Sequence, residues 1–327
     1  MLTDGLPSHV TIREVGPREG FQILKTIVPT ESKLKLIEAL VHSGIKEIEV
    51  ASFVRPDRVP TMADVDAVVA GLPRPSTVDF TALYLNQKGF LRAEQSGSLK
   101  NKGWLYTSPS ESFLKANSNL SLSDSLAAVS SWIELFTQHG KVLHGIMVSA
   151  AFGCGYEGRI ESVKVEDVVR RYIDECRKVG IVLQEICLAD TIGVANPHSV
   201  RTTVRALREL GVPTISLHLH NTWGLAAANV YAGLLEGVSV FESSVGGMGG
   251  CPFTPGASGN VATEDVVYLC HSMGVSTGID LKNLCEAAEL AESLTGATLS
   301  SEVYQAWKHS GRILPFPVEK SGMRDYP

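Results

Sequence analysis

The sequence predicts a (β/α)₈ barrel that is followed by an extra C-terminal helix and a tail. Short apolar segments alternate with longer amphipathic segments through most of the 327 residues. Eight such pairs occupy about 270 residues, which matches the usual size of this barrel. Segments such as Leu183–Ala189 are largely apolar throughout, as expected for parallel strands that are covered on both faces.

The predicted elements follow one another in a regular order, with a strand first in each pair and a helix after it. The predicted strands are Val10–Gly16, Glu47–Phe53, Val78–Tyr84, Gly103–Thr107, Leu143–Ala150, Leu183–Ala189, Thr214–His220 and Val238–Val245. The predicted helices include Glu31–Ser43, Ser123–His139, Val165–Val179, Pro197–Leu210 and Leu225–Glu236.

The ends of these helices carry residues that commonly cap helices. Thr30 precedes Glu31–Ser43 and is expected to be its N-cap, while Gly44 ends the helix. The later helices are each closed by a glycine, namely Gly140, Gly180, Gly211 and Gly237. Caps and apolar periodicity therefore predict the same element boundaries.

The chain continues beyond the eighth pair. Residues 1–275 are predicted to form the catalytic barrel, and residues 276–327 a helical extension packed on it. The extension contains the predicted helix Asp280–Thr295 and a proline-rich tail, residues 313–327. An open doubly wound sheet is the alternative, but the GxGxxG phosphate loop typical of that fold is missing after the first strand.

Composition excludes several classes of protein. Hydrophobic content of 44%, 20% charged residues and a net charge of −6 describe a soluble globular protein without a general nucleic-acid or membrane surface. The six cysteines contain no CxxC pair, which argues against a zinc ribbon or a dithiol redox motif. No signal peptide, transit peptide or membrane-spanning run of about 20 apolar residues is evident, so a cytoplasmic location is expected.

The main chemical signal is a pair of histidines, His218 and His220, at the end of the seventh predicted strand. Because side chains alternate along a strand, both rings are expected on the same face. Two imidazoles with a carboxylate and an amide oxygen form a mixed shell that suits Mg²⁺ or Mn²⁺. Glu19, just after the first strand, is the natural carboxylate. The alternatives without a metal are two hydrogen-bonded histidines and a salt bridge between Glu19 and Arg18.

A reactive thiol is predicted one βα unit later. Cys251 lies in the glycine-rich sequence GGMGGCPF, and Asn260 follows nine residues after it. Glycines permit unusual backbone angles, and such a loop suits a lid that closes over a substrate. A thiol near a cation can have its pKa moved toward neutrality and act as an acid or base. Cys251 is therefore expected to be functional, with a small apolar filler as the alternative.

Acidic residues also stand in the predicted strands. Glu49 and Asp190 lie among apolar neighbours, and unpaired burial of a carboxylate is costly, so each needs a partner or a role. Arg18 is the nearest candidate partner. Ser52 shares the second strand with Glu49, and Lys88 follows the third strand.

Apart from Lys88, these residues fall in five motifs: EVGPREGFQ, IEVASFVRPDRVP, ADTIGVANP, HLHNTWG and GGCPFTPGASGNVATED. In order and spacing the motifs resemble those of 3-hydroxy-3-methylglutaryl-CoA lyases, a family within the metal-dependent lyases and synthases built on a TIM barrel. The resemblance extends from Val10 to about Met273. It implies an acyl-CoA substrate, a divalent cation such as Mg²⁺ or Mn²⁺, and a ligand set of Glu19, His218, His220 and Asn260.

The resemblance also implies a reaction, the retro-Claisen cleavage of a 3-hydroxyacyl-CoA to acetyl-CoA and a keto acid, which is acetoacetate for the parent substrate. In this reaction Arg18 stabilises the enolate oxygen, Cys251 protonates the enolate, and Asp190 assists removal of the hydroxyl proton, with Glu49 supporting Arg18. The predicted catalytic residues are Arg18, Glu49, Asp190, His218 and Cys251, and the predicted substrate contacts are Arg18, Ser52 and Lys88.

Two departures from the family pattern concern the acyl group. Glu19 stands where the family has aspartate, and Asn221 and Trp223 stand in place of the aspartate and tyrosine of HDTY. They predict a different 3-hydroxyacyl-CoA, such as citramalyl-CoA or a longer-chain hydroxyglutaryl-CoA. A condensing synthase and a non-catalytic acyl-CoA binder are the alternative functions. The extra helix and tail are expected to contribute to a homo-oligomer.

Overall fold

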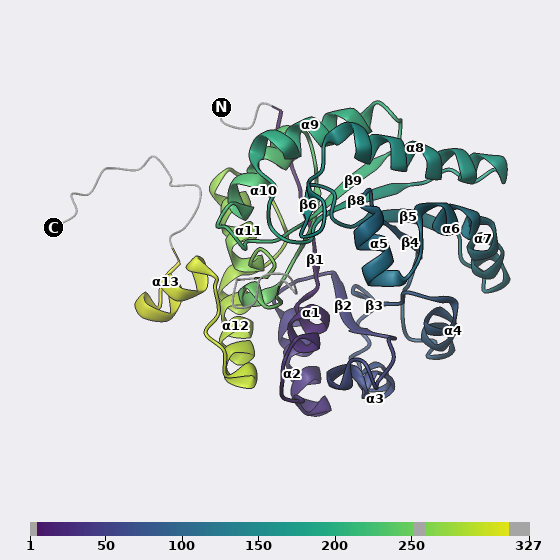
Figure 1. The fold of residues 1–327 in the computed structure, drawn as a ribbon. Helices are drawn as coiled ribbons and strands as arrows, with labels where there is room; N and C mark the ends of the chain where they lie inside the picture. The colour runs from purple at the N-terminus through teal and green to yellow at the C-terminus, as the bar shows by residue number, and fades with distance from the viewer. Residues whose placement is uncertain (1–4, 251–258, 314–327) are drawn as a thin grey trace.

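The computed structural model describes residues 5–250 and 259–313, and eight parallel strands form one curled sheet within them. Helices surround the sheet (Figure 1), which confirms the predicted (β/α)₈ barrel. The strands are β1 (Thr11–Glu14), β2 (Glu47–Ser52), β3 (Asp79–Leu83), β4 (Gly103–Thr107), β5 (Leu143–Val148), β8 (Glu185–Asp190), β9 (Thr214–Leu219) and β10 (Val240–Ser243). All eight predicted strands are present, and their ends differ from the prediction by at most two residues.

The barrel closes between β3 and β4, the two ends of the strand order β3-β2-β1-β10-β9-β8-β5-β4. In the described residues these two strands share no backbone ladder; one backbone hydrogen bond, from the Lys100 N–H to the Phe80 carbonyl, and several side-chain contacts join the two sides. The Tyr84 hydroxyl accepts the Trp104 N–H at 3.0 Å and donates to the Lys102 carbonyl at 3.0 Å. The Asn101 amide oxygen accepts the Ala82 N–H at 2.9 Å. The polar pocket described below lies at this seam.

The helices after the strands agree with the prediction except in one place. The predicted helix Ser123–His139 is two helices, α6 and α7, which meet at Ala128. The helices are α1 (Gly16–Gln22), α2 (Thr30–His42), α3 (Val65–Ala70), α4 (Gln87–Gln95), α5 (Glu111–Ser118), α6 (Leu122–Ala127), α7 (Val129–Gln138), α8 (Ser162–Lys178), α9 (Pro197–Arg208), α10 (Ala226–Leu235), α11 (Thr263–Ser272), α12 (Leu281–Thr295) and α13 (Glu302–Ser310). A short hairpin, β6 (Gly153–Cys154) and β7 (Gly158–Arg159), and two 3₁₀ turns, η1 (Pro60–Met62) and η2 (Val245–Gly247), lie in the loops.

One predicted cap is wrong. Pro29, not Thr30, occupies the N-cap position of α2, and its carbonyl accepts the N–H groups of Ser32 and Lys33. Thr30 is the first residue of the helix, and its hydroxyl donates to the Asp64 carboxylate at 2.7 Å. Pro29 has a restricted backbone angle φ and fixes the conformation at the start of α2. The Thr30 side chain is therefore available to bind Asp64, the N-cap residue of α3.

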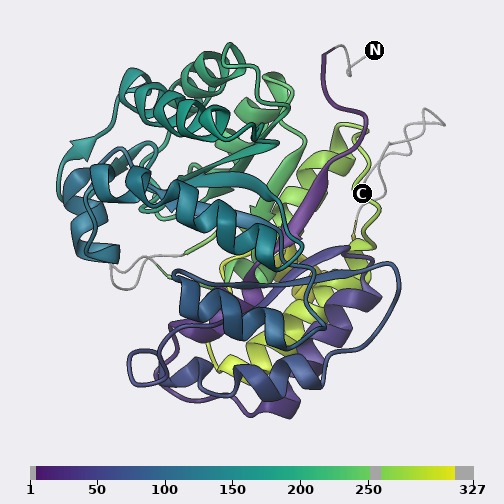
Figure 2. The same cartoon turned by 90° about the vertical axis from the view of Figure 1, so that its right-hand side faces the viewer.

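The predicted C-terminal helix is present as α12, which packs on α2 (Figures 1 and 2). The sequence did not reveal α13, which contacts α11 and α12. The Ser301 hydroxyl accepts the Tyr304 N–H to begin α13 and donates to Asp265 of α11 at 2.8 Å. The division at residue 275 into barrel and extension stays a prediction. None of the helices in the described ranges is long and apolar enough to cross a membrane.

Candidate metal centre and active site

The two histidines at the end of β9 come together with Glu19 of α1. The Nε2 atoms of His218 and His220 lie 3.1 Å apart, and the Oε1 atom of Glu19 lies 3.9 Å from Nε2 of His218. One potential ligand atom from each of the three residues lies within 4.8 Å of those of the other two. Both histidines are buried. The predicted grouping is therefore present, and its two imidazoles face a common point.

Asn260, which lies between β10 and α11, joins this group. Its backbone bridges that of His220, and its amide nitrogen donates to Oε2 of Glu19 at 2.7 Å and to the Met248 carbonyl at 3.0 Å. Its amide oxygen is buried and has no hydrogen-bond donor in the described residues. A buried oxygen without a donor is costly, and a cation would satisfy it. Two imidazole nitrogens, a carboxylate and an amide oxygen thus fit a divalent cation.

The electrostatics of the group also suit cation binding. Burial would raise the pKa of Glu19, but Arg18 and the two histidines outweigh it and lower that pKa to about 2. Burial and the charge of His218 lower the pKa of His220 to about 4. Burial lowers the pKa of His218, but Glu19 and Glu242 raise it by more. At neutral pH Glu19 is therefore an anion and His220 is neutral, the forms in which these groups bind metals.

Arg18 links the group to the interior of the barrel. Its Nη1 lies 2.7 Å from Oε1 of Glu19, and its Nε donates to the Glu49 carboxylate. The predicted pairing of Arg18 with Glu49 is thus present. Burial would lower the pKa of Arg18, but the two glutamates raise it above its usual range. The pKa of Glu49 is raised above its usual value, because burial raises it more than the charge of Arg18 lowers it.

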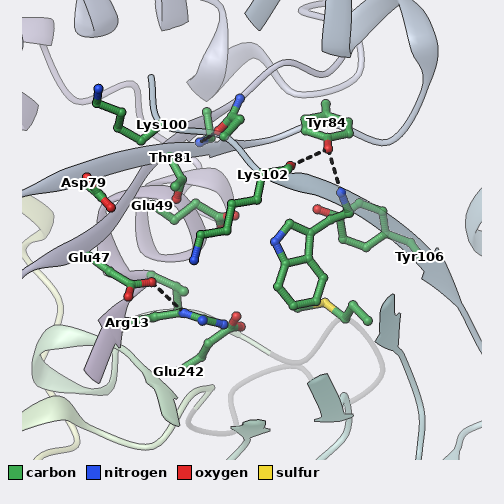
Figure 3. Close-up of a pocket in the computed structure, with 15 residues that line it drawn as sticks. Arg13, Glu47, Glu49, Asp79, Thr81, Tyr84, Lys100, Lys102, Tyr106 and Glu242 are labelled. Atoms are coloured by element: carbon green, nitrogen blue, oxygen red, sulfur yellow. Dashed lines mark hydrogen bonds and ion pairs between the residues drawn. The ribbon is translucent and has the colours of Figure 1, made fainter. Parts of the chain in front are cut away.

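Beside Glu49, the carboxylate partner of Arg18, lies a polar pocket that is partly open to solvent. Figure 3 shows Glu49, Tyr106 and Glu242 at this pocket together with Arg13 and Glu47, which are joined by an ion pair. The pocket lies at the seam between β3 and β4, and Lys100, Lys102 and Asn101 line it. It therefore extends from the opposite mouth of the barrel to the residues that hold Arg18 and His218.

Asp190 ends β8 and is fully buried. Its two carboxylate oxygens accept the N–H groups of Val194 at 2.9 Å and Ala195 at 3.1 Å. Burial raises its pKa to about 7, against these hydrogen bonds and the charge of His218. A carboxyl group with this pKa can exchange a proton near neutral pH. The same hydrogen bonds hold the loop after β8.

The remaining predicted residues have different outcomes. The Ser52 hydroxyl is buried at the end of β2 and donates to the Gln22 side chain of α1 at 3.2 Å. Lys88 is exposed in the first turn of α4, and within the described chain no hydrogen bond or ion pair joins it to the group around Glu19. Cys251 lies outside the described residues. The roles assigned to all three stay predictions.

The sequence did not reveal Glu242 as a partner of the histidines. This residue lies in β10, and its Oε2 is 3.0 Å from Nδ1 of His218. The available signal was the same one that drew attention to Glu49 and Asp190, an acidic side chain in a mostly apolar strand. The ion pairs of Arg13 with Glu47 and Glu185, lower in the barrel, were also missed.

Comparison with known proteins is consistent with this geometry. The model of the family described as HMGL-like matches residues 9–291. The chain is 40% identical over 303 residues to the mouse protein named 3-hydroxy-3-methylglutaryl-CoA lyase, cytoplasmic, covering 92% of this chain and 86% of the mouse protein. The crystal structure of hydroxymethylglutaryl-CoA lyase from Pseudomonas aeruginosa superposes with a TM-score of 0.85 at 38% identity, covering 93% of this chain and 99% of that one.

A second solved structure was determined with small molecules bound. It is that of an HMG-CoA lyase from Acinetobacter baumannii in complex with coenzyme A and 3-methylmalate, with a TM-score of 0.81, 34% identity and 98% of each chain covered. The match of the family model and of these relatives spans both the barrel and the residues around Glu19, His218 and His220. The chain therefore belongs to the HMGL-like family, which it resembles in sequence and fold.

Proposed function

We propose that the protein is a metal-dependent lyase that cleaves a carbon–carbon bond in a 3-hydroxy-3-methylglutaryl-CoA-like thioester. The products are acetyl-CoA and a keto acid, which is acetoacetate for the parent substrate. The observation that carries this proposal is the grouping of Glu19, His218 and His220 with the unsatisfied amide oxygen of Asn260. The relatives that match most of the chain are named as lyases of this kind.

The cofactor proposed for this group is Mg²⁺ or Mn²⁺. Glu19, His218, His220 and Asn260 would hold it, because their donor set combines nitrogen and oxygen. When bound, a cation of this kind polarises substrate oxygens and lowers the pKa of an alcohol. Both oxygens of Glu19 already have partners, Arg18 and Asn260, but a carboxylate can accept more than two contacts.

Arg18 is the residue proposed to meet the charge that develops on the thioester oxygen. Its guanidinium is oriented from two sides by Glu19 and Glu49. A guanidinium has five N–H donors in a fixed plane, so these two contacts leave others for the substrate. Donors that are oriented before the reaction stabilise a developing oxyanion without reorganisation at the moment of bond cleavage.

Two further residues are proposed to move protons. Asp190, with a pKa near 7, accepts the proton of the substrate hydroxyl. The electron pair of that O–H bond then forms the ketone, and the adjacent carbon–carbon bond breaks to leave the enolate of acetyl-CoA. Cys251 supplies a proton to the enolate carbon and becomes a thiolate, which regains a proton when the products leave.

We also propose an alternative acyl group for the substrate. Trp223 is 64% exposed and lies in the turn after β9, three residues beyond His220. The Asn221 amide oxygen accepts the Ala226 N–H at 3.1 Å and so holds the start of α10. Together with Glu19, these residues favour citramalyl-CoA or a longer-chain hydroxyglutaryl-CoA as the alternative substrate.

The test is an assay of acetyl-CoA release across a panel of 3-hydroxyacyl-CoA thioesters, with Mg²⁺ or Mn²⁺ and with a chelator. We expect the protein to release acetyl-CoA with Mg²⁺ or Mn²⁺ and to lose this activity when the chelator is added. Robust turnover of hydroxymethylglutaryl-CoA and of no other thioester would rule out the alternative acyl groups. Condensation without cleavage would indicate a synthase, and a metal-free protein that stays inert after cation addition would indicate a non-catalytic binder.

Two properties outside the site are also proposed. The protein is expected to be cytoplasmic and to form a homo-oligomer. Light scattering of the purified chain measures the second, and a monomer across the micromolar range would contradict it.

A further inference from the structure

Glu242 occupies a position in the barrel interior that is set by strand register. In the parallel ladders of β10, Glu242 is paired with Arg13 of β1 on one side and with His218 of β9 on the other. Register partners in parallel strands direct their side chains to the same face of the sheet. Glu242 is mostly buried, and Figure 3 shows it beside Arg13 at the pocket.

The Glu242 carboxylate is committed to His218 rather than to Arg13. Arg13 already donates to Glu185 twice, at 2.5 and 2.8 Å, and to Glu47 at 2.7 Å. Its guanidinium charge is therefore balanced without Glu242. In contrast, the Oε2 atom of Glu242 is 3.0 Å from Nδ1 of His218. Because an ionised carboxylate can only accept, this contact requires a proton on Nδ1 of His218.

A proton fixed on Nδ1 leaves the other nitrogen of a neutral imidazole as a lone pair. In His218 that nitrogen is Nε2, the atom that faces His220 at 3.1 Å and Glu19 at 3.9 Å. His220 has no comparable support, since its buried Nδ1 has no hydrogen-bond partner in the described residues. Among the described residues, only the ring of His218 is thus oriented by a carboxylate.

We infer that Glu242 is a positioning residue for the metal centre: it fixes the ring orientation and the tautomer of His218 so that Nε2 presents its lone pair to the cation. Glu242 does not touch the substrate in this inference. It rests on the metal site of the proposed function. Carboxylates that hydrogen-bond a metal-binding histidine typically contribute about 10- to 100-fold in metal affinity.

Two substitutions separate the charge of Glu242 from its hydrogen bond. Glu242→Gln keeps the length of the side chain and an accepting oxygen but removes the charge. Glu242→Leu has a similar volume and removes both. Glu47→Gln is the matched control, because Glu47 lines the same pocket and binds Arg13, but two strands, β1 and β10, separate its strand from that of His218.

The experiment uses the full chain and measures the affinity for Mn²⁺ by electron paramagnetic resonance. Thermal unfolding without metal and ¹⁵N spectra of the histidine rings are recorded on the same samples. We expect Mn²⁺ binding to weaken about 10-fold in Glu242→Gln and more in Glu242→Leu, and to be unchanged in Glu47→Gln. The Nδ1–H signal assigned to His218, identified by its loss in His218→Gln, is expected to disappear in Glu242→Leu.

The outcomes distinguish this inference from the proposed function. Folded Glu242→Gln and Glu242→Leu proteins that bind Mn²⁺ as tightly as the wild type would overturn it, and so would equal weakening in Glu47→Gln. A wild-type protein that binds no Mn²⁺ would overturn both the inference and the metal site. A wild type that binds Mn²⁺ with the expected effects of Glu242 but releases no acetyl-CoA would overturn the lyase function and leave the inference supported.

Discussion

The Nε2 atoms of His218 and His220 lie 3.1 Å apart, too close for both to carry protons and well placed for both to face one cation. We therefore expect His220→Ala to lower Mn²⁺ affinity by more than about 100-fold, a larger loss than is typical when an outer-shell partner is removed. Titration of the purified variant with Mn²⁺ measures this loss.

The matched control for this prediction is His144→Ala. His144 is also inside the barrel, where its Nε2 lies 3.2 Å from the Glu185 carboxylate, away from the metal-ligand group. Its substitution is expected to leave Mn²⁺ affinity unchanged. Equal affinities for wild type and His220→Ala would show that the two histidines are a hydrogen-bonded pair without a ligand role.

Much of this architecture was predictable because its causes are local. The eight strands are short apolar runs whose ends are marked by polar residues, and glycines with positive φ end the helices at Gly140, Gly180, Gly211 and Gly237. The residues around the metal centre were predictable for a related reason. In a parallel barrel the carboxyl ends of all strands meet at one mouth, so polar residues at strand ends converge.

The parts that the sequence did not reveal depend on register and on distant contacts. Glu242 meets His218 only because β10 pairs with β9 in one register, and a shift of one residue would turn Glu242 to the other face. Thr30 was predicted to be a cap because its hydrogen bond to Asp64, the N-cap residue of α3, has no local signal in the sequence. Helix α13 has only nine residues and depends on Asp265 of α11 for its start.

Glu19→Asp tests whether the longer carboxylate is needed for metal binding. The side chain of Glu19 reaches Arg18 at 2.7 Å and Asn260 at 2.7 Å, and aspartate is one methylene shorter. We expect the variant to retain the cation, because the carboxylate and the three other donors remain, and to change its preference among acyl-CoA substrates. Metal content after dialysis and the substrate panel measure these effects. Complete loss of metal would show that the site geometry differs from that of the family.

Cys251 is expected to be the thiol that reacts first with an alkylating agent. The other five cysteines are buried, and burial raises the pKa of Cys176 to about 11 and of Cys270 and Cys285 to about 12. Because the thiolate is the nucleophile, such thiols react slowly at neutral pH. Limited treatment with iodoacetamide, followed by peptide mass spectrometry, should find the label on Cys251.

The catalytic role of Cys251 is tested in the same preparation. Cys251→Ala is expected to abolish most acetyl-CoA release while it retains the fold and the bound Mn²⁺, because the thiol is assigned to proton transfer and not to metal binding. Cys270→Ala is the control, and it should keep its activity at a temperature where the protein stays folded. Full activity in Cys251→Ala would contradict the acid role.

Glu14 makes folding stability depend on pH. It is fully buried, and its carboxylate accepts the N–H groups of Gly16 and Val245 and the hydroxyl of Thr263 at 2.6 to 2.8 Å. Burial raises its pKa from 4.5 to about 7, against these hydrogen bonds. Because the folded-state pKa is the higher one, the stability that Glu14 contributes is fully present below about pH 4.5 and is lost as the pH rises through 7.

Glu14→Gln replaces the protonated acid with a neutral amide that does not titrate. Between pH 5 and pH 8 we expect the free energy of unfolding of the wild type to fall relative to that of Glu14→Gln, by at most about 3 kcal/mol. Urea denaturation of both proteins at several pH values measures the difference. Asp190 also titrates near pH 7, but it is present in both proteins and cancels. A difference that stays constant with pH would mean that Glu14 remains ionised in the folded barrel, because its three hydrogen bonds offset its burial.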